Sequence, residues 1–298
     1  MLKRILTAAV ALAILIPILL FAPDIAVQGL FSLLSVIAIY EIACVTGIKK
    51  EYGFWIPVAF LLFLDQWFMQ DIVNRISLML DAELFYRVHW LLNIPYSALP
   101  FVLLFVIVYI VLRNKKLNPA DALTFFAMSF YAAKGFDALE DLCMRGDRLS
   151  VLGGDAVITL DRVFLWIALS VPWVADSLAY FAGRFFGKKK LCPDISPKKT
   201  VAGAVGGVVG TGVLYAVLYG ILGSWNPVEL LVSAGAAMCL AVASIFGDLF
   251  ASVVKRHYGV KDYGNLFPGH GGVMDRFDST IPVALMFMMV LPTLMIMY

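Results

Sequence analysis

A dense group of acids, cations and glycines lies between Gly247 and Asp278, in a chain that otherwise carries few charges. Asp248, Ser252 and Lys255 are spaced i, i+4 and i+7, which places all three on one face if the segment is helical. Carboxylates beside ammonium groups are typical of phosphoryl- and nucleotidyl-transfer sites, where positioning and charge neutralisation supply most of the rate. The stretch therefore predicts a phosphate-handling site.

The loop that follows, from residue 261 to 278, is rich in glycine. Three glycines surround its histidine: Gly269, Gly271 and Gly272 around His270. Such glycines let backbone N–H groups approach phosphate oxygens closely. Asp275 and Asp278 are three apart, so a helical turn would present both carboxylates to one metal–phosphate centre. Magnesium favours hard oxygen ligands and keeps waters and substrate phosphates in its shell, so two or three carboxylates suffice.

Each of these elements has an ordinary structural explanation when it is taken alone. His270 would be a loop histidine with a satisfied hydrogen bond, and Lys255 and Arg256 would form a solvated helix face. The clustering of so many ionisable groups in a charge-poor chain favours a functional site instead.

A second polar segment, residues 170–184, carries Asp176 inside an apolar run. A carboxylate in a membrane span is costly and usually marks a site or a pathway. Asp176, Tyr180 and Gly183 share one helical face, with Arg184 near it at the membrane exit. The alternative is a structural aspartate that pairs with a neighbouring helix.

A basic, turn-rich loop, residues 187–200, comes next and contains five lysines. These five lysines suit either anionic lipid headgroups or nucleotide phosphates. A topogenic cluster that only fixes membrane orientation explains it equally well. Its core, Ser196-Pro-Lys-Lys-Thr200, is more particular than a charge run requires.

The composition indicates that these segments belong to an integral membrane protein. Of 298 residues, 62% are hydrophobic and only 15% charged, whereas a soluble domain is about a quarter charged. We predict an all-α, polytopic transmembrane bundle with about nine spans, since a helix needs about 20 apolar residues to cross. The predicted spans are residues 5–22, 27–48, 54–70, 97–113, 119–134, 160–184, 201–223, 228–251 and 280–298. The third and fifth are short; Asp65 interrupts the third and Lys134 closes the fifth.

The basic residues give the orientation of this bundle. In the nine-span arrangement 17 of the 23 Lys and Arg residues fall on one side, which the positive-inside rule makes cytoplasmic, together with the N-terminus. The first apolar run follows Lys3 and Arg4 but has no small-x-small cleavage site, so it is expected to be a retained helix. Outer loops are expected at residues 71–96 and 135–161.

We expect one integral membrane domain across residues 1–298. Its N-terminal helices occupy residues 1–159 and its catalytic half residues 160–298. The four cysteines are far apart and predict neither a disulfide framework nor a zinc site.

The stretch from Ser252 to Asp278 resembles the signature of the phosphatidate cytidylyltransferase (CDP-diglyceride synthetase) family. It contains Ser-x-x-Lys-Arg, Lys-Asp-x-Gly, Phe-Pro-x-His-Gly-Gly and Asp-Arg-x-Asp in order, with Leu266 as a variable position. The run from Asp176 to Gly187 and the Ser-Pro-Lys-Lys-Thr loop are similar to two other motifs of that family. One departure is Ala202, where the family usually has an acidic residue, which puts a ligand role at that position in doubt.

The resemblance implies a set of site residues and partners. A magnesium centre would be held by Asp248 and Asp275 with Asp278 nearby, and potassium is a candidate second ion. The CTP triphosphate would be contacted by Lys255, Arg256, Lys261 and His270, within a site that also includes Ser252, Gly271, Gly272 and Arg276. The phosphatidic acid headgroup would be bound by Lys198, Lys199 and Arg184, beside Asp176. The resemblance further implies a homodimer in a bacterial cell membrane, a cytoplasmic active site, acyl chains that enter sideways from the membrane lipids, and no nucleic-acid partner.

Transfer of the cytidylyl group of CTP to phosphatidic acid is the function that follows from this resemblance. Two rival classes stay open at this point. A CTP-dependent kinase of polyprenol or phytol could share the same acids and cations, while a transporter would explain the spans and Asp176 but not the glycines and acids around His270.

Overall fold

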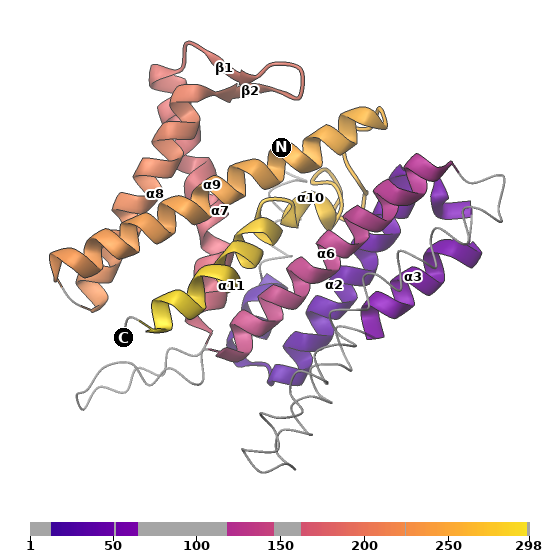
Figure 1. Ribbon diagram of the computed structural model, residues 1–298, viewed down its shortest axis with the longest axis horizontal. Helices are drawn as coiled ribbons and strands as arrows, with labels where there is room; N and C mark the ends of the chain where they lie inside the picture. The colour runs from indigo at the N-terminus through magenta and orange to yellow at the C-terminus, as the bar shows by residue number, and fades with distance from the viewer. Residues whose placement is uncertain (1–12, 51, 65–117, 146–161, 224, 297–298) are drawn as a thin grey trace. The chain divides into compact units, whose positions relative to one another are not determined.

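The computed structural model describes residues 13–50, 52–64, 118–145, 162–223 and 225–296 (Figure 1). The chain forms two compact units. The first comprises the chain up to Asp137 together with residues 263–268 and 272–274. The second comprises residues 138–262 and 269–271 and the chain from Asp275 onward. The loop of residues 261–278, called the signature loop from here on, therefore contributes to both units in alternation.

The first unit is built on helices α2 (Asp24–Val45), α3 (Tyr52–Leu64) and most of α6 (Pro119–Arg145). Helix α2 begins after Pro23 with Asp24 in its first turn, where a carboxylate suits the positive end of the helix dipole. It ends at Thr46, whose hydroxyl donates to the Ile42 carbonyl at 2.9 Å. A short 3₁₀ helix, η1 (Ile48–Lys50), leads into α3.

The core of the first unit is aromatic and aliphatic. The fully buried rings of Phe31 on α2 and Phe136 on α6 lie 6.5 Å apart, centroid to centroid. Because lipid is as apolar as these side chains, contacts of this kind stabilise membrane helices through close packing and not through removal of apolar surface from water.

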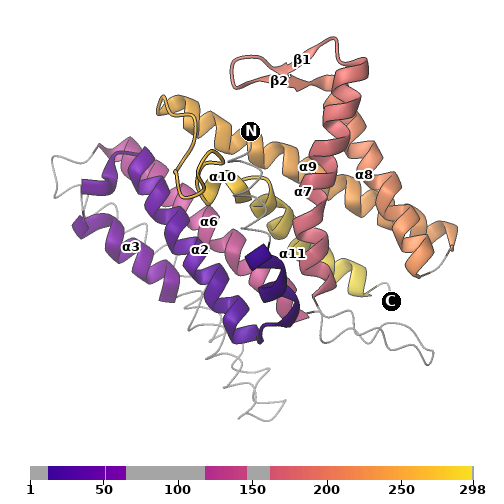
Figure 2. The same ribbon diagram turned by 180° about the vertical axis from the view of Figure 1, so that it is seen from behind.

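The second unit contains α7 (Val163–Phe186), α8 (Val201–Leu222), α9 (Pro227–His257), the short α10 (Met274–Phe277) from Asp275 onward, and α11 (Thr280–Ile296). Helices α7 and α8 lie side by side in both views (Figures 1 and 2). Their close approach depends on glycine: a Cβ at Gly203 or Gly207 would lie 2.8 Å from a carbonyl oxygen of α7. Small residues four apart are the usual means by which membrane helices pack closely.

Helix α9 has strong local signals at its start. The Asn226 side chain accepts from the Val228 N–H at 2.9 Å, and Pro227 occupies the first helical position, where its missing N–H costs nothing. The helix is continuous to His257, beyond the predicted end at residue 251. Asp248, Ser252 and Lys255 therefore do share one helix, as the sequence predicts.

The basic segment between α7 and α8 is a hairpin and not the loop that the sequence predicts. Strands β1 (Lys190–Cys192) and β2 (Ser196–Thr200) pair antiparallel, with Lys190 opposite Thr200. Thr200 then caps α8, because its side-chain oxygen accepts from the Gly203 N–H at 3.1 Å. The hairpin lies at one end of α7 and α8 (Figure 2).

Four of the described helices are long and apolar enough to cross a membrane: α2, α7, α8 and α9. They correspond to the predicted spans 27–48, 160–184, 201–223 and 228–251. Helix α11, with a shorter apolar stretch at Thr280–Val290, matches the last predicted span. The protein is therefore a helical membrane protein; the count of nine spans and the side of the N-terminus stay predictions.

The fifth predicted span is wrong at its C-terminal end. Helix α6 does not close at Lys134 but continues to Arg145. The Lys134 ammonium pairs with the Asp137 carboxylate at 3.0 Å one turn later, so the charge is accommodated on the helix surface. The predicted outer loop 135–161 accordingly begins as helix.

The remaining predicted elements lie wholly or partly outside the described residues. The span at 97–113 and the loop at 71–96 are not described, nor are the ends of the spans at 5–22 and 54–70 that fall outside residues 13–22 and 54–64. None of the four cysteines, all of which lie in the described residues, forms a disulfide.

Candidate active site

Three separate motifs of the second unit meet around one cavity of about 500 Å³. Helix α7 contributes Asp176, Tyr180 and Arg184 to its wall, β2 contributes Lys198 and Lys199, and α9 contributes Asp248. The sequence predicted the i, i+4 face of α7 and the Ser-Pro-Lys-Lys-Thr motif separately. The structure brings them together with the first acid of the signature stretch.

Two of the residues that line this cavity form an ion pair between the hairpin and α9. Lys199 Nζ lies 2.5 Å from Asp248 Oδ2, and about a quarter of each side chain is exposed. The Lys199 nitrogen itself is buried, so the Asp248 carboxylate takes the place of solvent as its partner. On the α7 side, Arg184 donates to the Tyr180 hydroxyl at 3.1 Å and is exposed.

Glycines set the distance between the hairpin and α7. A Cβ at Gly183 would lie 2.7 Å from Thr200 Oγ1, and one at Gly187 would lie 2.8 Å from the same atom. These two glycines of the Asp176–Gly187 motif therefore hold the strand that carries Lys198 and Lys199 against α7.

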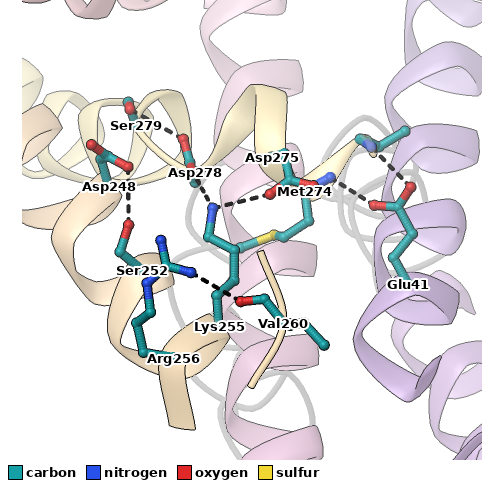
Figure 3. A network of polar contacts seen from close by, with 11 residues as sticks. Glu41, Asp248, Ser252, Lys255, Arg256, Val260, Met274, Asp275, Asp278 and Ser279 are labelled. Atoms are coloured by element: carbon teal, nitrogen blue, oxygen red, sulfur yellow. Dashed lines mark hydrogen bonds and ion pairs between the residues drawn. The ribbon is translucent and has the colours of Figure 1, made fainter. Parts of the chain in front are cut away.

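A second group of charges is buried at the end of α9 (Figure 3). Lys255 is 8% exposed and its ammonium lies 3.0 Å from Asp275 Oδ1 and 3.5 Å from Asp278 Oδ2. One turn earlier on the helix, the Ser252 hydroxyl donates to Asp248 Oδ1 at 3.4 Å. The predicted helical face of α9 thus faces the two acids of the Asp-Arg-x-Asp motif.

The three acids share one electrostatic environment. The pKa of Asp278 is raised to about 6, by burial first and then by the carboxylates of Asp248 and Asp275, against the opposing effect of the Lys255 ammonium. A carboxylate whose pKa is raised by neighbouring carboxylates is one that a further cation would stabilise.

Two glycines of the signature loop have a conformation that other residues rarely adopt. Gly269 and Gly271 have φ of 81° and 88°. A Cβ at Gly271 would also lie 2.8 Å from Asp275 Oδ2. The loop therefore passes close to the acid that pairs with Lys255.

The other predicted site residues are not gathered into the same cavity. Arg256, Lys261 and Arg276 are exposed and His270 is half-buried. The Arg256 guanidinium donates to the Val260 carbonyl at 3.1 Å, which ties the end of α9 to the loop (Figure 3). Their contacts with a triphosphate stay predictions.

The predicted metal centre is supported by its donor chemistry and not by a ready-made cage. In the described part of the chain, no three His, Cys, Asp or Glu side chains are grouped so that they could hold an ion by themselves. Asp248, Asp275 and Asp278 nevertheless supply hard oxygen donors within electrostatic range of one another. Magnesium is commonly held by one or two carboxylates plus water and substrate phosphates, so this donor set fits a metal that arrives with a nucleotide.

One buried charged residue of the first unit was not among the site residues predicted from the sequence. Glu41 lies on α2, is 5% exposed, and accepts from the backbone N–H groups of Val273 and Met274 at 2.9 Å each (Figure 3). The signal that singled out Asp176, a carboxylate inside an apolar span, was present at Glu41 as well.

The chain matches the profile of the cytidylyltransferase family over residues 2–294. It is 45% identical over 116 residues to the phosphatidate cytidylyltransferase of Bacillus subtilis, an alignment that covers 39% of this chain and 42% of that protein. It is 41% identical over 121 residues to the enzyme of the same name from Thermotoga maritima, covering 40% and 45% of the two chains. The aligned stretch thus spans less than half the length of these two relatives.

A third relative, the phosphatidate cytidylyltransferase of Staphylococcus haemolyticus, aligns along its length. It is 31% identical over 294 residues, which cover 99% of this chain and 97% of that protein. The family resemblance read from the signature stretch is confirmed by both findings. This chain belongs to the cytidylyltransferase family.

Proposed function

We propose that this protein transfers the cytidylyl group of CTP to phosphatidic acid, forming CDP-diacylglycerol and pyrophosphate. The observation that carries the proposal is the convergence of Asp176, Lys199 and Asp248 on one cavity. These residues come from three separate motifs of a cytidylyltransferase-family protein. The relatives named phosphatidate cytidylyltransferase supply the acceptor, phosphatidic acid.

The reaction joins two anions, so their repulsion is the obstacle that the protein must remove. A phosphate oxygen of phosphatidic acid attacks the α-phosphorus of CTP, the bond from that phosphorus to the bridging oxygen breaks, and pyrophosphate leaves with the electron pair. No protein nucleophile is required, because the acceptor is already ionised at neutral pH. Fixed cations near the reacting phosphates act where the negative charge develops, which is the most effective form of electrostatic catalysis.

The two ion-paired lysines of the site suit an exchange of partners with the substrates. Lys199 is paired with Asp248, and Lys255 with Asp275 and Asp278. When phosphates enter, the ammonium groups gain phosphate oxygens as partners and the carboxylates become available to a cation. Magnesium, when bound, would supply charge neutralisation at the phosphates of CTP.

The division of the substrates between the residues follows the charges. Arg184, Lys198 and Lys199 are proposed to bind the phosphatidic acid headgroup, with Asp176 at the wall of the same cavity. The triphosphate is assigned to the glycine-rich loop and the cations around it: Lys255, Arg256, Lys261, His270, Gly271, Gly272 and Arg276, with Ser252 beside Asp248. Potassium is kept as a second ion of the proposed centre.

The same proposal places the active site on the cytoplasmic face of a nine-span bundle. It is supported by the distribution of Lys and Arg along the sequence and by the four apolar helices long enough to span. A homodimer in a bacterial cell membrane, with lipid substrate that arrives from the bilayer, completes the proposal.

One assay tests the reaction type. Purified protein in detergent is incubated with magnesium, phosphatidic acid and CTP labelled in the cytosine ring. Label in the organic phase is the expected result. Label that stays in water as CDP, with an alcohol acceptor phosphorylated instead, would mean a lipid kinase, and intact CTP in every condition would overturn the enzymatic proposal.

A further inference from the structure

Glu41 is a carboxylate buried in a helix that is otherwise suited to lipid. Helix α2 is one of the four apolar helices of spanning length, and Glu41 is 5% exposed within it. Such a residue is costly in a membrane span and is retained where it has a definite partner. Its partners belong to the signature loop, more than 230 positions later in the sequence.

The contact is a two-pronged one to backbone N–H groups. Glu41 Oε1 accepts from the Val273 amide and Oε2 from the Met274 amide, each at 2.9 Å (Figure 3). Hydrogen bonds to a charged acceptor are stronger than neutral ones, and two parallel bonds fix orientation as well as distance. A carboxylate is the only ordinary side-chain group with two acceptor oxygens in this arrangement.

Two glycines of the loop make room for this carboxylate. A Cβ added at Gly264 or at Gly272 would collide with the carboxyl group of Glu41. Neither glycine has a φ in the left-handed region, so their backbone conformation does not call for glycine. The space they leave is the space that Glu41 occupies.

The hydrogen bonds to Glu41 lie immediately before an acid of the candidate site in the sequence. Met274 is the first residue of α10, and Asp275 follows it directly. Asp275 in turn meets the Lys255 ammonium at 3.0 Å. Fixing the peptide groups of Val273 and Met274 limits the directions in which the next side chain can point.

We propose that Glu41 is a positioning residue: it holds the backbone that precedes Asp275, and so sets the orientation of that carboxylate for cytidylyl transfer. This inference rests on the proposed function only in giving Asp275 a role in the reaction. The contact joins Glu41, in the N-terminal half of the chain where the sequence offers no motif, to the signature loop.

The direct test is Glu41→Gln. The amide keeps the shape but presents one oxygen and one NH₂, so one backbone N–H faces another donor. We expect kcat to fall on the order of tenfold to a hundredfold, with the KM values for CTP and phosphatidic acid changed less than about threefold, because alignment and not affinity is lost. Thr46→Val is the matched control: it removes a buried hydrogen bond at the end of the same helix, whose acceptor is the Ile42 carbonyl and not a group of the loop.

A second readout does not need activity. In hydrogen–deuterium exchange, Glu41→Gln is expected to raise exchange at the amides of residues 273–278, whereas Thr46→Val leaves that segment protected. Exchange at these amides that stays at the wild-type level, or that rises equally in both variants, would overturn the inference. If the wild-type protein forms no CDP-lipid, the proposed function fails, and this measurement still decides whether Glu41 holds the loop.

A double-mutant cycle covers the case in which Glu41→Gln does not fold. Gly272→Ala adds a methyl group against the Glu41 carboxyl, and Glu41→Asp withdraws that carboxyl by one methylene. If the two groups touch, the double variant loses less activity than the product of the two single losses. Independent, multiplying losses would contradict the contact.

Discussion

Lys199 of the hairpin and Asp248 of α9 form an ion pair with their charged atoms 2.5 Å apart, at the wall of the cavity that Asp176 also lines. A partly exposed pair of this kind contributes only about 0–1 kcal/mol to folding. Its more important effect is to hold Lys199 and Asp248, which are about fifty residues apart in the sequence, at the wall of the same cavity.

Loss of the Lys199 charge is expected to weaken lipid binding more than folding. Lys199→Met should raise the KM for phosphatidic acid about tenfold, as expected for one lost charge-assisted hydrogen bond. Thermal stability should change by less than about 0.5 kcal/mol, because the pair is partly exposed. Lys188→Met, at an exposed lysine of the same basic run that does not line the cavity, is the control. Equal effects of the two changes in steady-state kinetics would mean that only the net charge of the run matters.

Loss of the buried Lys255 charge is expected to cost stability as well as activity. Lys255→Met leaves Asp275 and Asp278 without their ammonium partner in a buried environment, which should destabilise the fold by about 3–5 kcal/mol. Denaturant unfolding in detergent measures the change. Lys261→Met, at an exposed position, should stay within about 0.5 kcal/mol of the wild type. A Lys255→Met protein as stable as wild type would show that the acids are neutral or partnered by another cation.

Gly271 can be tested against a glycine of similar backbone conformation. Gly271 and Gly259 have φ of 88° and 66°, so alanine costs about 1–2 kcal/mol of strain at either position. Only at Gly271 does the new Cβ approach the Asp275 carboxylate; at Gly259 nothing lies within 4 Å. We expect Gly271→Ala to lower kcat at least tenfold and Gly259→Ala to keep wild-type turnover per folded molecule. If kcat fell equally in both variants, backbone strain alone would explain the loss, and the approach to Asp275 would have no part in it.

Removal of divalent ions is expected to stop turnover without unfolding the protein. With chelator present, label transfer from CTP to lipid should cease, and it should return on addition of magnesium, because Asp248, Asp275 and Asp278 would bind the ion together with substrate phosphates. The fold should persist, since each of these acids is already paired with Lys199 or Lys255. Circular dichroism in the same samples reports folding. Undiminished turnover in metal-free buffer would end the metal proposal.

Helix packing gives a prediction that is independent of the reaction. Gly207→Ala places a methyl group 2.8 Å from the Ala175 carbonyl oxygen, which should separate α7 from α8 and cost about 1–3 kcal/mol. Gly235→Ala on α9 meets nothing within 4 Å and should be neutral or stabilising by up to about 1 kcal/mol. Unfolding in detergent compares the two. Equal stabilities would mean that the close approach of the two helices is not maintained in the membrane protein.

Local sequence signals were sufficient to predict the long apolar helices and to recognise the family. The apolar lengths predicted α2, α7, α8 and α9, and the spacing of Asp248, Ser252 and Lys255 placed them on one face, because helix period and membrane thickness act within a single segment. Lys134 misled the prediction of where α6 ends, since an ion pair with Asp137 one turn later makes the charge acceptable. The hairpin was missed because its strands are short and its residues are typical of turns.

By itself, the sequence determined that this is a helical membrane protein of the cytidylyltransferase family and which polar residues are too costly to lie there without a partner. Only the tertiary structure decided who those partners are: Lys199 for Asp248, Lys255 for Asp275 and Asp278, and the amides of Val273 and Met274 for Glu41. The physical reason is distance along the chain. Periodicity and composition report on neighbours within a few turns, whereas these contacts close loops of about 20 to more than 200 residues, whose geometry depends on how whole helices pack.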